Sequence, residues 1–105
     1  MAIVKGKEHY EYQERKRIDK QEMLDGINRI KKASKHWNRE RKLNYMDYLA
    51  EEYNKLEKAY NKPFGEGWAC ETIIMTSING DMEYFSADLE ALYDLYHYID
   101  VTLDD

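Results

Sequence analysis

The sequence predicts a single α+β domain with the element order ααββα. Apolar residues recur at helical spacing in two segments of the first half, an Asn79-Gly80 pair separates two runs of β-forming residues, and a third helical seam closes the chain. A length of 105 residues suits one domain with a modest core. We assign residues 18–105 to this domain and residues 1–17 to a charged tail or a short edge strand through Ala2-Ile3-Val4.

The first predicted helix begins at Asp19, which can cap the helix with Glu22 as its reciprocal partner. Gly26 lies inside this helix, where glycine costs about 1 kcal/mol relative to alanine. The residues expected to face the core recur every three or four positions: Met23, Ile27, Ile30, Ser34 and Trp37.

The second predicted helix begins near Asn44 as its N-cap and ends before Pro63, because a residue that precedes proline disfavours helical geometry. One face carries an apolar seam of Met46, Leu49, Tyr53, Leu56 and Tyr60. We expect the two helices to form an antiparallel pair, joined by a turn through the basic stretch Arg39–Lys42.

Residues 69–85 are predicted to form a β-hairpin, because Asn-Gly is the strongest signal for a two-residue type I′ turn. Such a turn sets the register, in which the predicted pairs are Ile78 with Asp81, Met75 with Tyr84, and Ile74 with Phe85. One face would carry Ile74, Ile78 and Phe85, and the other Ile73, Met75, Met82 and Tyr84. Since both faces are apolar and a lone hairpin is marginally stable, we expect the sheet to extend through residues 2–4 or across a homodimer.

The last predicted helix is capped by Ser86, with Asp88 in its first turn where a negative charge complements the helix dipole. Its apolar seam comprises Leu89, Leu92, Tyr96, Ile99 and Leu103.

The charged residues are divided unevenly along the chain. The first 62 residues contain all 16 Lys and Arg together with 11 Asp and Glu, whereas the rest contain ten Asp and Glu. No lysine or arginine follows Lys62 in the sequence. An asymmetry of this size bears on partners and solubility rather than on fold.

The sequence contains no pattern typical of catalysis, metal binding or membrane insertion. The longest apolar run is far too short to span a bilayer, and the N-terminus has no apolar segment of signal-peptide length, so we predict a cytoplasmic protein. His9, His36 and His97 lack the close spacing of metal ligands, and the lone Cys70 is expected to be a small buried hydrophobe. We therefore predict no enzymatic activity, no metal and no cofactor.

The acidic, tyrosine-rich second half is the leading candidate for a binding surface. Tyrosine supplies rigid contact area at binding hot spots, and repeated carboxylates can mimic a row of phosphates to a basic groove. The sequence predicts a non-enzymatic protein-binding module that docks on a basic partner surface through Asp81, Glu83, Tyr84, Glu90, Tyr93, Asp94, His97, Tyr98 and Asp100.

A partner whose basic surface normally holds nucleic acid would then be inhibited by competition. In small size, high charge and lack of a catalytic motif, the chain resembles phage or mobile-element inhibitors of host nucleic-acid-processing enzymes, including DNA-mimicking anti-CRISPR proteins. The resemblance is one of style, because no motif identifies a family.

An alternative hypothesis is a nucleic-acid-binding regulatory module that uses the basic stretch between Arg29 and Lys42. Basic residues interleaved with Trp37 are typical of surfaces that follow phosphates and stack on bases. The negative field of the second half opposes this alternative. Its candidate contacts are Arg29, Lys32, Lys35, Arg39, Arg41 and Lys42.

Overall fold

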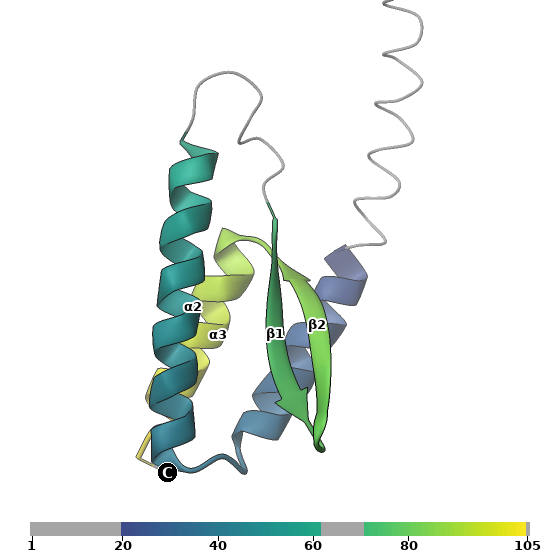
Figure 1. Ribbon diagram of the computed structural model, residues 1–105, viewed down its shortest axis with the longest axis vertical. Helices are drawn as coiled ribbons and strands as arrows, with labels where there is room; N and C mark the ends of the chain where they lie inside the picture. The colour runs from purple at the N-terminus through teal and green to yellow at the C-terminus, as the bar shows by residue number, and fades with distance from the viewer. Residues whose placement is uncertain (1–19, 62–70, 105) are drawn as a thin grey trace, which may run out of the picture.

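A computed structural model describes residues 20–61 and 71–104 of the chain (Figure 1). Residues 20–34 lie in the first helix, and they are followed by α2 (Arg39–Tyr60), β1 (Thr72–Ile78), β2 (Asp81–Ala87) and α3 (Leu89–Val101). This order confirms the predicted α+β class. The predicted cap Asp19, the tail or edge strand in residues 1–17, and Cys70 lie outside the described residues.

In the view of Figure 1 the first helix and α3 lie behind the two-stranded antiparallel sheet, and α2 lies beside β1. The first helix and α2 run in opposite directions, as predicted, and α3 returns antiparallel to α2. β1 lies toward α2, whereas β2 lies toward the first helix, whose Gly26 faces Phe85. The sheet is therefore covered on one face only by the described residues.

The start of α2 corrects the sequence prediction. The N-cap is Asn38, whose side-chain oxygen accepts a hydrogen bond from the Arg41 amide at 2.8 Å, and Asn44 lies inside the helix. The connection occupies residues 35–38, so Arg39–Lys42 form the first turn of α2 rather than a turn between helices. Arginine and lysine are good helix formers, and Glu40 in the first turn complements the helix dipole.

The start of α3 also differs from the prediction by two residues. Asp88 is the N-cap, and its carboxylate accepts a hydrogen bond from the Ala91 amide at 2.8 Å. Ser86 instead belongs to β2, where it pairs with Ile73. The strand continues to Ala87 because that side chain is fully buried, which leaves the next residue to begin the helix.

The hairpin has the predicted turn and register. Asn79 and Gly80 have φ values of 54° and 89°, the left-handed region that a type I′ turn requires at both positions. The three predicted cross-strand pairs all form, and Ile74 and Phe85 are buried against the helices. The opposite face, called here the outer face, is exposed and carries Ile73, Met75, Ser77, Met82, Tyr84 and Ser86.

Side chains of α2 cover the free edge of β1. The Met75 amide donates to the Tyr48 hydroxyl at 3.3 Å, and Arg41 Nη2 donates to the Ser77 carbonyl at 2.7 Å. These outward main-chain groups are the ones that a neighbouring strand would otherwise use.

The core follows the predicted helical seams with local differences. In the first helix Met23, Ile27, Ile30 and Ser34 are buried, in agreement with the prediction. In α2, Tyr60 is 51% exposed rather than buried. In α3, Leu95 joins Leu92 and Ile99 among the fully buried side chains, although it was not part of the predicted seam. Burial of each leucine or isoleucine contributes about 1.5–3 kcal/mol.

Gly26 is required by close packing. A Cβ atom at this position would lie 2.0 Å from Cδ1 of the buried Phe85 ring. Glycine therefore lets the first helix approach β2 closely, at the cost of its weak helix propensity.

We predict that Gly26→Ala destabilises the fold by about 1–3 kcal/mol, because overpacking outweighs the gain in helix propensity. Urea denaturation measures the change. The control is Asn28→Ala at an exposed position of the same helix, which should change stability little. A Gly26→Ala protein as stable as the parent would contradict this account of the packing.

Candidate functional site

One exposed side of α3 gathers several of the predicted binding residues. The spacings of three, one and three residues place four of them on one side of the helix: Glu90, Tyr93, Asp94 and His97. Asp100 follows one turn later and is also exposed. Tyr93 is 63% exposed, and its ring stacks on His97 with an interplanar angle of 1°. We call these five residues the α3 stripe.

The remaining predicted binding residues lie elsewhere. Tyr84 is on the outer face of the hairpin, Asp81 flanks the hairpin turn, and Glu83 is half-buried on the inner face opposite Thr76. Tyr98 is half-buried, with the Lys31 ammonium 5.6 Å from its ring centroid. The structure thus divides the predicted set between α3 and the hairpin instead of joining it into one surface.

Basic residues from the first half supply counter-charges to the acidic half. Lys31 on the first helix forms an ion pair with Asp94, and Arg39 on α2 forms one with Asp104. The Arg39–Asp104 pair is largely exposed and contributes little to stability, whereas the Lys31 side chain is only 22% exposed. Glu90 and Asp100 form no ion pair with any residue in 20–61 or 71–104, so they remain the unpaired carboxylates of the α3 stripe.

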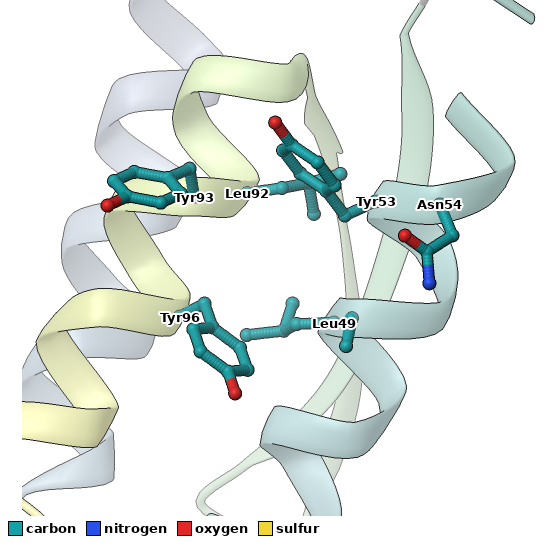
Figure 2. Close-up of a pocket in the computed structure, with 7 residues that line it drawn as sticks. Leu49, Tyr53, Asn54, Leu92, Tyr93 and Tyr96 are labelled. Atoms are coloured by element: carbon teal, nitrogen blue, oxygen red, sulfur yellow. The ribbon is translucent and has the colours of Figure 1, made fainter. Parts of the chain in front are cut away.

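An apolar groove lies between α2 and α3, beside the α3 stripe (Figure 2). It has a volume of about 240 Å³ and is lined by Leu49, Ala50, Tyr53, Asn54, Leu92, Tyr93 and Tyr96. In Figure 2, Tyr53 extends from α2 near Leu92, while Tyr96 on α3 lies across from Leu49. Helical spacing predicted Tyr53 and Tyr96 to lie in core seams and did not indicate the groove. The small side chain of Ala50 between larger residues is the signal that could have indicated it.

Two residues of the basic stretch make structural contacts within the chain. Lys42 is only 4% exposed, and its ammonium donates to the Thr102 carbonyl at 2.7 Å, just past the end of α3. The guanidinium of Arg41 lies 4.3 Å from the Trp37 ring centroid in addition to its bond with Ser77. These two side chains therefore hold α2 against α3 and the hairpin.

The other four candidates for nucleic-acid contact differ in their surroundings. Arg39 is paired with Asp104, and the Arg29 guanidinium lies 5.0 Å from the Phe85 ring centroid. Lys32 and Lys35 are exposed. Four of the six predicted basic residues thus contact other residues of the same chain. The sequence did not predict these contacts.

Tyr45 is a buried polar group beside this basic cluster. Its ring meets Trp37 edge-on with centroids 5.1 Å apart. Burial raises the pKa of its hydroxyl well above the usual value of 10.0. The nearby Thr76 side chain lowers this pKa, but by less than burial raises it. The hydroxyl makes no hydrogen bond of normal geometry with a described residue. The Tyr45 ring thus serves as packing against Trp37.

The described residues contain no metal cluster or membrane-spanning helix, and the chain has no match among known proteins. Within residues 20–61 and 71–104, no group of three His, Cys, Asp or Glu side chains is arranged to hold a metal ion. No helix in the same residues combines the length and apolarity needed to cross a membrane. No family model, curated protein or solved structure matches the chain.

We predict that Lys42→Met destabilises the protein by about 1.5–3 kcal/mol, since it removes the charged hydrogen-bond donor from the part-buried Thr102 carbonyl. Chemical denaturation checks this. Lys35→Met, at an exposed site, is the matched control and should have little effect. Equal stability of the two variants would show that the Lys42–Thr102 contact is not structural.

Proposed function

We propose that this protein is a non-enzymatic binding module that docks the α3 stripe on a basic surface of a partner protein. The observation that carries the proposal is the joint exposure of Tyr93 and His97 with the unpaired carboxylates of Glu90 and Asp100. Exposed tyrosine provides contact area at low entropic cost, and surrounding carboxylates complement and steer a basic partner.

The packing of α3 supports this proposal. The side of the helix opposite the stripe is anchored in the core by Leu92, Leu95 and Ile99, all fully buried. A binding surface on a rigid helix loses less conformational freedom on association than one on a loop. The α3 stripe is therefore presented in a preorganised form.

The partner class that suits this surface is a protein whose basic groove normally receives nucleic acid. Glu90 and Asp100 are ten residues apart on one helix, a separation of roughly 15 Å along the helix axis. Carboxylates distributed along a rod can occupy sites that otherwise hold phosphates. By this proposal the protein acts as a competitive inhibitor, in the style of phage or mobile-element anti-defence proteins.

We test this function by affinity capture from host lysate with mass spectrometry, run with and without nuclease. The Glu90→Lys, Asp100→Lys double variant should lose partner capture, because it reverses both unpaired charges. The control is Glu22→Lys, Asp25→Lys on the first helix, which makes the same charge change at exposed positions. Unchanged capture by the α3 variant, or equal loss in both, would rule out docking through α3.

The outer face of the hairpin supports the further proposal of a homodimer. Its apolar side chains, Ile73, Met75, Met82 and Tyr84, are all at least 44% exposed, and its other two positions are serines. A face without charge does not repel a second copy of itself even on a molecule of net charge −5, so two copies can pack sheet against sheet around a two-fold axis.

We expect the full chain to be dimeric by sedimentation equilibrium and Met82→Glu to make it monomeric, because a buried unpaired carboxylate is costly. Leu24→Glu, at an exposed leucine of the first helix, should leave the dimer intact. A monomeric parent protein would exclude this use of the outer face.

A further inference from the structure

The groove between α2 and α3 is sized for a side chain of a partner. Its volume of about 240 Å³ lies below the roughly 300–1,000 Å³ of typical small-molecule sites. Its lining is apolar and aromatic except for the amide of Asn54 (Figure 2). It is therefore suited to one large apolar side chain inserted between Tyr53 and Tyr96.

Unpaired carboxylates lie one helical turn beyond each end of this groove. Glu57 follows Tyr53 by four residues on α2, and Asp100 follows Tyr96 by four residues on α3. Because the two helices are antiparallel, these carboxylates mark opposite ends of the groove. Both are exposed, and neither forms an ion pair with another described residue.

The distance between the two ends corresponds to a short helix. Figure 2 places Leu49 and Tyr96 across the groove from each other, with Tyr53 one turn further along α2. Glu57 and Asp100 are then separated by about three helical turns, or roughly 16–18 Å. A helix of about 12 residues spans this length.

We propose that the groove binds a basic amphipathic helix of the partner. One large apolar side chain of the partner helix enters between Tyr53 and Tyr96. Lysine or arginine side chains near the two ends of that helix pair with Glu57 and Asp100. This is helix-in-groove recognition reinforced by charge complementarity. The inference rests on the proposed function and specifies the partner segment. A second copy of this chain is disfavoured, because its α3 stripe would bring Glu90 and Asp100 against the same carboxylates.

The probe is a synthetic amphipathic helix of about 12 residues made only of leucine and lysine. Two peptides serve as controls: one of the same composition in scrambled order, and one with every lysine replaced by glutamate. Methyl NMR of the full chain follows Leu49 and Leu92, which line the groove. We expect saturable shifts at these two leucines with the leucine–lysine helix, and none with either control.

Two variants, Ala50→Trp and Glu57→Lys, test the site, and Asn44→Trp is the control. Ala50→Trp fills the groove, whereas Asn44→Trp places a tryptophan at an exposed α2 position that does not line it. Glu57→Lys leaves the groove open and reverses one end charge, so it remains informative if Ala50→Trp fails to fold. Ala50→Trp and Glu57→Lys should each weaken peptide binding at least about tenfold, whereas Asn44→Trp should not.

The inference is overturned if the probe gives no saturable shifts, if the shifts fall on the outer face at Met75 and Met82, or if Ala50→Trp and Glu57→Lys bind it as tightly as the parent. Lysate capture separates the two proposals. Loss of partner capture in Glu90→Lys, Asp100→Lys but not in Ala50→Trp or Glu57→Lys overturns the groove and leaves docking through α3 intact. Retention of capture in all of these variants overturns both.

Discussion

The burial of one hairpin face against the helices is the contact on which the rest of this structure depends. Two strands are too few to be stable in water, so Ile74 and Phe85 must be covered. The close approach of Gly26 to Phe85 brings the first helix under β2, and the fully buried Leu92, Leu95 and Ile99 join α3 to the same core. Once this side of α3 is buried, the opposite side faces solvent, and the orientation of the α3 stripe follows from packing.

Folding brings the basic and acidic halves of the sequence together. Lys31 meets Asp94, Arg39 meets Asp104, and the Lys42 ammonium bonds the Thr102 carbonyl. Basic and acidic side chains are therefore less separated in the folded protein than they are along the sequence. What remains distinct is a smaller set of carboxylates without ion pairs among the described residues, which includes Glu57 from the nominally basic half.

Sequence patterns predicted the elements and the hairpin register well, because helical periodicity and the Asn79-Gly80 turn are local signals. The caps were wrong where two capping residues compete: Asn38 with Asn44, and Asp88 with Ser86. The buried Lys42 was not predictable, because lysine is almost never fully buried and its partner Thr102 lies 60 residues away. The groove was not predicted because it forms only where α2 packs beside α3. The spacing of residues within one helix does not reveal which other helix it contacts.

The bonds from Tyr48 and Arg41 to β1 determine where this sheet can grow. With the Met75 amide and the Ser77 carbonyl already engaged, a further strand could add beside β1 only by displacing two α2 side chains. Strand addition, whether productive or as the first step of aggregation, is therefore directed to the edge of β2. Among the described residues, side chains of α2 close the edge of β1, so a polymer that grows by strand addition would begin at the edge of β2.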